Sequence, residues 1–156
     1  MRNLEVKILG NGFGLPLPKY ETEGAAGLDL FAATKEDTKI IIPSRKAEMI
    51  PTGIAISVPS GYEAQIRPRS GLAAKNGITV LNTPGTIDSD YRGEILVMLI
   101  NHSNKDFEIL RGMRIAQMVI SKIEQFNLIS VDRLDTTDRG KDGFGSTGIS
   151  IKKDEE

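Results

Sequence analysis

Residues 52–67, TGIAISVPSGYEAQIR, carry the pattern that decides the fold class. Apolar residues alternate with small or polar ones over 54–58 and again over 62–67, which is the period-two signature of half-buried β-strands. Pro59-Ser60-Gly61 between the two runs supplies turn chemistry, because proline presets φ and glycine accepts a positive φ. We therefore predict that the two strands form a β-hairpin.

Short apolar runs continue on both sides of this stretch. Two of them, EILVMLI at 94–100 and RIAQMVISKI at 114–123, are apolar on both faces, so we expect central strands that are covered on both sides. Helical periodicity is nearly confined to 70–75, where Ser70 is the expected N-cap. Two further strands are predicted at 38–42 and 107–110. Strands this short and frequent indicate a sandwich, a jelly roll or a small barrel.

The composition excludes several classes of site and partner. The 156 residues contain 20 Lys and Arg against 21 Asp and Glu, a net charge of −1 that argues against a domain built to hold nucleic acid. Without cysteine there is no disulfide or thiolate site, and a single histidine, His102, excludes multi-histidine metal sites and disfavours a Ser-His triad. No segment reaches the length of a membrane span or of a secretory signal, so we expect a cytoplasmic protein with no membrane partner.

The sequence predicts a β-rich core domain at 1–134 and a tail at 135–156. The tail contains DTTDRGKDGFGSTG at 135–148, whose glycines predict a flexible segment that contributes little to a core. Two of these glycines have the spacing of a P-loop, but a serine occupies the lysine position and too few residues follow to form the required helix. The tail therefore offers an arginine, one aromatic ring and hydroxyl groups, and the alternative is a disordered terminus.

The sequence RPRSGL at 67–72 joins a predicted strand to the predicted helix. Arg67 and Arg69 bring fork-shaped donors that match phosphate oxygens, and residues that open a helix point their backbone N–H groups at an anion. This combination indicates a phosphate site. A charged strand end followed by a helix cap is the competing interpretation of the same residues.

The sequence NTPGTIDSDYRG at 82–93 lies between two predicted strands and carries two carboxylates, a phenol and an arginine. Since histidine and cysteine are not available for catalysis, a carboxylate is the best remaining general base. Asp88 follows the apolar Ile87 and is expected to be partly buried, whereas Asp90 is expected in a turn. An Asp-rich turn closed by Gly93 explains this segment equally well when it is considered alone.

Two polar side chains interrupt apolar or small-residue segments elsewhere in the chain. Asp29 lies within GAAGLDL at 24–30, where a carboxylate needs a partner such as an arginine, backbone N–H groups or a hydrated cation. Gln117 is the polar residue of the apolar run at 115–120. Its amide must be satisfied, either by a ligand or by the backbone.

Taken in order, five segments resemble the motifs of the trimeric deoxyuridine triphosphate nucleotidohydrolases, the dUTPases. They are GAAGLDL (24–30), PRSGLAAKNG (68–77), GTIDSDYRG (85–93), RIAQMV (114–119) and RGKDGFGSTG (139–148). The resemblance covers nearly the whole chain and implies a jelly-roll-like β fold and a homotrimer with sites shared between subunits. It further implies that Mg²⁺-dependent hydrolysis of dUTP gives dUMP and pyrophosphate, which limits uracil incorporation into DNA and supplies dUMP for thymidylate synthesis.

The resemblance also implies roles for individual residues. Asp88 is similar to the base that activates the attacking water, and Asp29 to a residue that contacts the metal through water. Tyr91 resembles the residue packed under deoxyribose, and Asn82 lies where the family reads uracil. The substrate-binding positions that the resemblance implies are Arg69, Ser70, Gly71, Asn82, Thr86, Ile87, Tyr91, Gln117, Arg139, Phe144, Gly145 and Ser146.

The tail and the strand after Asp88 bear on the alternative functions. By the resemblance, Arg139 grips the γ-phosphate and Phe144 covers the base, which argues against a catalytically silent nucleotide-binding protein on the same scaffold. A dCTP deaminase shares this scaffold but places a catalytic glutamate on the strand after the Asp-containing loop. Alignment on Asp88 and Gly93 puts Met98 at that position, and a thioether cannot transfer the proton.

Overall fold

The computed structural model describes residues 3–143. By its internal contacts the chain divides into two units, Met1–Glu124 and Gln125–Glu156, each of which is described by itself. The strands are β1 (Glu5–Ile8), β2 (Leu28–Phe31), β3 (Lys39–Ile42), β4 (Ala47–Pro51), β5 (Ile54–Ser57), β6 (Tyr62–Arg67), β7 (Ile78–Val80), β8 (Gly85–Ile87), β9 (Leu96–Asn101), β10 (Phe107–Leu110) and β11 (Arg114–Lys122). The helices are the 3₁₀ turn η1 (Gly10–Gly12) and α1 (Ser70–Asn76). The predicted boundary at residue 134 stays a prediction.

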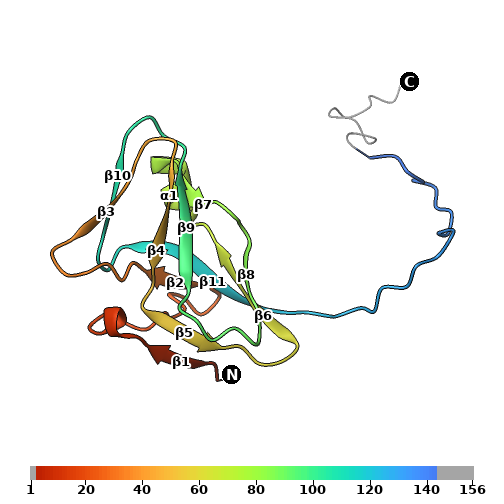
Figure 1. Ribbon diagram of the computed structural model, residues 1–156, viewed down its shortest axis with the longest axis horizontal. Coiled ribbons are helices and arrows are strands. Elements are labelled where there is room, and N and C mark those ends of the chain that lie inside the picture. The colour runs from red at the N-terminus through yellow and green to blue at the C-terminus, as the bar shows by residue number, and fades with distance from the viewer. Residues whose placement is uncertain (1–2, 144–156) are drawn as a thin grey trace. The chain divides into compact units, whose positions relative to one another are not determined.

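The strands of the first unit form small antiparallel sheets (Figure 1). A four-stranded sheet has the order β2-β11-β6-β8, a three-stranded sheet the order β4-β9-β7, and two pairs are β1-β5 and β10-β3. Strands β9 and β11 are central in their sheets, as predicted, but one face of each is only partly buried, so the predicted cover on both sides is incomplete within the described residues. The described residues are therefore mostly β with one short α-helix, which confirms the predicted all-β fold class.

The predicted hairpin at 52–67 is wrong. Strand β5 pairs with β1, with Val6 opposite Ile56, and β6 pairs with β11 and β8. The turn is present, since Gly61 takes φ +80° and the Tyr62 N–H donates to the Pro59 carbonyl, but it leads the chain from one sheet into another (Figure 1). Turn residues specify a change of direction; which strands pair is decided by partners that are distant in the sequence.

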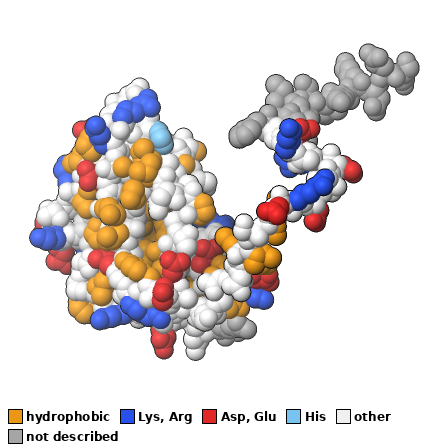
Figure 2. All heavy atoms as spheres, turned by 45° about the vertical axis from the view of Figure 1, so that its right-hand side comes forward, with side chains coloured by type: hydrophobic (Ala, Val, Ile, Leu, Met, Phe, Trp, Pro, Cys, Tyr) orange, Lys and Arg blue, Asp and Glu red, His pale blue; other side chains and the backbone are white. Residues whose placement is uncertain are grey.

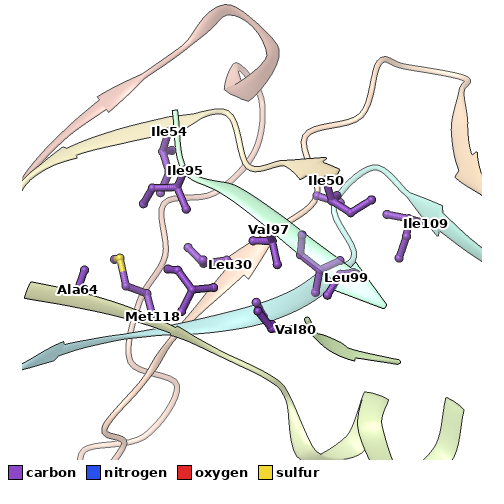
Figure 3. Packing of buried hydrophobic residues seen from close by; sticks show 14 of the residues in the cluster. Leu30, Ile50, Ile54, Ala64, Val80, Ile95, Val97, Leu99, Ile109 and Met118 are labelled. Carbon is purple, nitrogen blue, oxygen red and sulfur yellow. The ribbon is translucent and has the colours of Figure 1, made fainter. Parts of the chain in front are cut away.

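One apolar cluster joins all four sheets (Figure 3). Leu30 of β2 and Met118 of β11 point toward Val97 and Leu99 of β9, and these side chains are at most 1% exposed. Asn101 ends β9 within the core and is fully buried. Its Nδ2 donates to the carbonyl oxygens of Ile42 at 3.0 Å and Lys105 at 2.8 Å, so its burial is compensated by hydrogen bonds.

Helix α1 connects β6 to β7 and lies beside β7 (Figure 1). Its N-cap is Arg69, with no side-chain cap hydrogen bond, so the prediction of Ser70 as the cap is wrong by one residue. The helix ends at Gly77, whose φ of +67° lets its N–H bond to the carbonyls of Leu72 and Ala73. Among residues 3–143, no helix is long and apolar enough to cross a membrane.

Residues 125–143, the described part of the second unit, contain turns and extended chain rather than a helix or strand. Arg139 Nε donates to the carbonyl oxygen of Asp142 at 3.0 Å, and the Gly140 N–H donates to Thr137 Oγ1 at 3.1 Å. These bonds are local. Phe144, Gly145 and Ser146 lie outside the described residues.

Candidate active site

An open hollow of about 440 Å³ lies where β2 and β11 meet helix α1, and we call it the Asp29 hollow. Its lining residues are Asp29, Arg69, Ser70, Gly71, Leu72, Lys75, Asn76 and Gln117. Five of these eight are site residues predicted from the sequence, and they come from three separate motifs. The structure thus brings together the first, second and fourth of the five segments.

The register of the four-stranded sheet places the polar groups of the hollow. Gln117 of β11 lies opposite Asp29 of β2 on one side and Arg67 of β6 on the other. Residues directly opposite in neighbouring strands present their side chains on the same face of the sheet. Asp29 and Gln117 therefore share a face, and the chain leaving β6 carries Arg69 and Ser70 to its edge.

Asp29 has the arginine partners that its apolar surroundings require. Its Oδ1 lies 3.1 Å from Arg69 Nε and its Oδ2 lies 3.5 Å from Arg114 Nε, and its side chain is 16% exposed. Sequence reasoning expected a partner for Asp29 but did not single out Arg114. The available signal was the place of Arg114 at the start of the segment RIAQMV.

Gln117 satisfies its amide against the backbone while it lines the Asp29 hollow. Its Nε2 donates to the carbonyl oxygen of Pro68 at 3.0 Å. A Cβ built on Gly27 would lie 2.3 Å from Gln117 Oε1. The absence of a side chain at Gly27 therefore allows Gln117 to occupy this position.

The donor set of the Asp29 hollow suits an anion. The guanidinium of Arg69, the hydroxyl of Ser70 and the ammonium of Lys75 line the hollow together with one carboxylate, that of Asp29. Guanidinium and ammonium groups are the usual partners of phosphate oxygens in proteins. Gly71 has open space where a Cβ would be, so the backbone is accessible there. Lys75 and Asn76 were not predicted as site residues, although they belong to the segment PRSGLAAKNG.

A second group of predicted site residues lies in the segment 82–93 around β8, which we call the Asp88 loop. Asp88 follows the end of β8 and is exposed, so the expectation of partial burial is wrong. The apolar Ile87 is itself half-buried against β6, opposite Ala64, but the next side chain along a strand points to the other face. Asp90 is exposed in the turn, as expected.

Tyr91 is held by the backbone of the Asp88 loop. Its Oη donates to the carbonyl oxygen of Glu94 at 3.0 Å, and its N–H donates to the carbonyl of Asp88 at 3.2 Å. A Cβ on Gly93 would lie 2.3 Å from Tyr91 Oη, so only glycine accommodates this ring position. The residue remains 43% exposed, which leaves it available to a ligand.

The other predicted residues of the Asp88 loop surround the short strand β8. Thr86 is exposed and pairs with Gln65. Asn82 is exposed, and its Nδ2 would lie 3.2 Å from a Cβ on the buried Gly85. Among residues 3–143, the lining of the Asp29 hollow includes no residue of the Asp88 loop. A single chain therefore presents two separate groups of site residues.

The balance of charge on the surface agrees with the composition. Figure 2 shows Lys and Arg side chains interspersed with Asp and Glu on the face in view, with hydrophobic patches between them. That face carries no continuous basic stripe of the kind that tracks a nucleic-acid backbone. Within residues 3–143, no three His, Cys, Asp or Glu side chains are grouped so that they could hold a metal ion.

Solved structures of dUTPases share this fold. A mutant of Staphylococcus bacteriophage 80alpha dUTPase with dUpNHpp is 25% identical, with a TM-score of 0.83 over 96% of this chain and 100% of that chain. A mutant of the dUTPase from phage phi11 of S. aureus, whose structure concerns the coordination of a structural Mg(II) ion, is 22% identical. With a TM-score of 0.75 over 86% of this chain and 100% of that chain, it matches in fold.

Sequence comparison identifies the family directly. The family model described as dUTPase matches residues 14–148. The deoxyuridine 5'-triphosphate nucleotidohydrolase of Beijerinckia indica is 57% identical over 143 residues, 92% of this chain and 89% of that protein. The enzyme of the same name from Rhizobium rhizogenes is 55% identical over 141 residues, 90% of each chain. The family model and these relatives, together with the fold, show that the chain belongs to the dUTPase family.

Proposed function

We propose that this protein hydrolyses dUTP to dUMP and pyrophosphate. The observation that carries the proposal is the Asp29 hollow, which is lined by Asp29, Arg69, Ser70 and Gln117 from three of the five segments and in which Arg69 pairs with Asp29. In a member of the dUTPase family, such a donor set suits the phosphates of the substrate. We take the reaction to occur in the cytoplasm. There it limits uracil incorporation into DNA and supplies dUMP for thymidylate synthesis.

Asp88 is the general base in this proposal. Hydrolysis at phosphorus needs an aligned water and a carboxylate that accepts its proton. Asp88 is exposed at the end of β8 and makes no ion pair within the described residues, so its oxygens are free to accept a proton.

Asn82, Thr86 and Ile87 form the surface that reads uracil, and Tyr91 packs under deoxyribose.

The active enzyme in this proposal is a homotrimer with sites shared between subunits. The Asp29 hollow holds the phosphate contacts and the Asp88 loop holds the base, and within the described chain they are separate. A second copy that places its Asp88 loop against the hollow would complete the site. Arg139 and Phe144 of a tail then close it over the γ-phosphate and the base.

Mg²⁺ fits this site as an ion held mainly by the substrate. Each oxygen of Asp29 faces one guanidinium and retains a lone pair that can accept a hydrogen bond from water. Mg²⁺ keeps several waters and binds through phosphates together with one or two carboxylates. Asp29 would hold it through such a water. The bound ion supplies positive charge to the phosphate oxygens.

Met98 distinguishes hydrolysis from deamination. It lies on β9 opposite Met49 and is half-buried, at the position where the alignment would require a glutamate. A thioether neither donates nor accepts a proton at neutral pH. The dCTP deaminase alternative is therefore not favoured.

A panel of nucleotides tests the proposed function. The protein is incubated with dUTP, dCTP, dTTP and UTP in the presence of Mg²⁺, and both pyrophosphate and the identity of the base are followed. Rapid pyrophosphate release from dUTP alone is expected. Conversion of dCTP to dUTP, or no turnover of dUTP, would contradict the proposal.

A further inference from the structure

A network of four charged side chains borders the Asp29 hollow. Arg114 Nη2 lies 3.0 Å from Glu21 Oε1, and Arg114 Nε lies 3.5 Å from Asp29 Oδ2. Asp29 Oδ1 in turn lies 3.1 Å from Arg69 Nε. Arg69 also donates from Nη1 to the Arg114 carbonyl oxygen at 3.2 Å. Two guanidinium groups and two carboxylates thus form one continuous chain from the segment before β2 to the hollow.

A β-bulge brings Arg114 into this network. Gln117 lies opposite Asp29 and Ala116 opposite Leu30, but Arg114 lies opposite Phe31, so the register shifts by one residue at Ile115. Without the shift, Arg114 would point to the face of the sheet opposite to that of Asp29. With it, the guanidinium lies on the same face as Asp29, and its Cζ is 5.7 Å from the centre of the Phe31 ring.

The guanidinium of Arg114 contacts two carboxylates at unequal distances. Its shorter contact is with Glu21, and its longer contact is with Asp29. The isolated bridge between Tyr20 and Leu28 holds Glu21 beside β2. Glu21 therefore attracts positive charge away from Asp29 and leaves Asp29 to be neutralised mainly by Arg69, the arginine that lines the hollow.

We infer that Glu21 is a positioning residue that weakens phosphate binding in the Asp29 hollow by sharing Arg114 with Asp29. When Glu21 loses its charge, Arg114 is free to pair closely with Asp29. Arg69 is then less engaged with Asp29, and its guanidinium is more available to a triphosphate. This inference rests on the proposed function for the identity of the nucleotide, but the phosphate chemistry can be tested without the nucleoside.

The test compares Glu21→Gln with Glu23→Gln. The first variant removes the charge that contacts Arg114. The second removes an equal charge two residues away, from an exposed side chain with no ion pair among the described residues. Binding of dUpNHpp and of inorganic triphosphate is measured by calorimetry at low and high salt, and KM and kcat for dUTP are measured in parallel.

For Glu21→Gln we expect Kd for both probes to fall roughly 3- to 10-fold at low salt, since one charge near a multiply charged anion has an effect of this order. The gain should shrink at high salt, because the network is partly exposed and is screened. KM should fall with Kd and kcat should change less. Glu23→Gln should leave Kd within about two-fold of the value for the unmodified protein, because an exposed charge without an ion pair is screened by solvent and salt.

Arg114→Gln decides whether Glu21 acts through Arg114. In that background, Glu21→Gln should have no further effect on Kd, and an undiminished gain would overturn the inference in favour of a general field effect. Equal effects of Glu21→Gln and Glu23→Gln, or weaker binding in Glu21→Gln, would also overturn it. Since Arg114→Gln also leaves Asp29 with one partner, thermal unfolding verifies that it is folded. If it is not, Arg114→Met, which also removes the charge and keeps an apolar stem, replaces it.

The probes separate this inference from the proposed function. If the unmodified protein binds inorganic triphosphate but neither hydrolyses dUTP nor binds dUpNHpp, the proposed function fails while the comparison of Glu21→Gln with Glu23→Gln still decides the inference. If the unmodified protein binds no triphosphate, the Asp29 hollow is not a phosphate site and the inference fails.

Discussion

Asp88 and Gln117 serve the site in different ways. Asp88 projects from the end of a three-residue strand into solvent, so its carboxylate is free for chemistry but depends on other groups to place the substrate. Gln117 lies within a nine-residue strand, and its side chain is fixed by the Pro68 carbonyl on one side and by the bare backbone of Gly27 on the other. Substitutions at these two places should therefore affect activity through different steps.

The variant Asp88→Asn keeps the size of the side chain and removes the base. We expect kcat for dUTP to fall by about 10²–10⁴-fold, the usual contribution of general-base catalysis, with the Kd of dUpNHpp largely unchanged. Asp90→Asn is the matched control, because Asp90 is also exposed and lies two residues further along the same turn. If Asp88→Asn retains turnover within a few-fold of the unmodified enzyme, Asp88 is not the base.

The variant Gly27→Ala tests the close approach of Gln117. Its Cβ would lie 2.3 Å from Gln117 Oε1, so the amide must move away from the Asp29 hollow. A displacement of about 1 Å in a positioned group can reduce the rate by roughly 10²-fold, and kcat/KM for dUTP should fall by this order.

Gly24→Ala is the control for this position, since a Cβ at Gly24 meets nothing within 4 Å and the residue belongs to the same small-residue segment. Equal activity of the two alanine variants would show that Gln117 needs no defined position.

At the scale of the elements, two central strands build the core, and one of them also reaches the site. Strand β11 contributes Ile115 and Met118 to the core and Gln117 to the Asp29 hollow. Strand β9 contributes Val97 and Leu99 to the same core and ends at the buried Asn101. The burial of both strands fixes their register, because a slip of one residue would expose every core side chain on them.

Asn101→Ala should destabilise the fold rather than the chemistry. The Asn101 side chain donates to the Ile42 and Lys105 carbonyls, and its Oδ1 accepts from the Ser103 N–H and hydroxyl. Leaving buried polar groups without partners costs about 1–3 kcal/mol each, so the free energy of unfolding should fall by roughly 2–4 kcal/mol. Denaturant unfolding at fixed protein concentration measures this change.

The exposed Asn104→Ala supplies the comparison for Asn101→Ala, since Asn104 accepts a single bond from Arg45 at the surface. If the two variants lose the same free energy of unfolding, the buried hydrogen bonds of Asn101 stabilise the fold no more than the surface hydrogen bond of Asn104 does.

At the scale of the whole molecule, the separation of the Asp29 hollow from the Asp88 loop leads to a prediction about subunits. A chain that lacks residues 138–156 should be folded but nearly inactive, and Asp88→Asn should be inactive with its tail intact. When the two are unfolded and refolded together, some sites combine an intact Asp88 from one chain with an intact tail from another. For random mixing of equal amounts, about a quarter of the sites of the symmetric oligomer should be complete.

Activity of the mixed sample, measured as pyrophosphate release from dUTP, should therefore recover to about that fraction. Each variant refolded alone, and the two mixed without unfolding, should remain inactive. No recovery in oligomers that are verified to be mixed would refute the shared site.

The sequence determines which residues are strands and which are candidates for the site. Alternation over 54–58 and 62–67, and two-sided apolar character in β9 and β11, depend on local periodicity, and periodicity is a property that a sequence displays directly. The positions of Asp29 and Gln117 are equally visible, because a polar group among small or apolar residues must find a partner.

Only the tertiary structure decides which of these segments meet. The strands on either side of Pro59-Ser60-Gly61 belong to different sheets, because pairing depends on β1 and β11, which are distant in sequence. Asp88 is exposed although it follows an apolar residue, because the strand ends there. The bulge at Ile115 turns Arg114 toward Asp29 and Glu21. Residues 115–120 are apolar on both faces apart from Gln117, so the bulge is not visible in the hydrophobic pattern, and the partners of Asp29 become known only when the two strands are seen side by side.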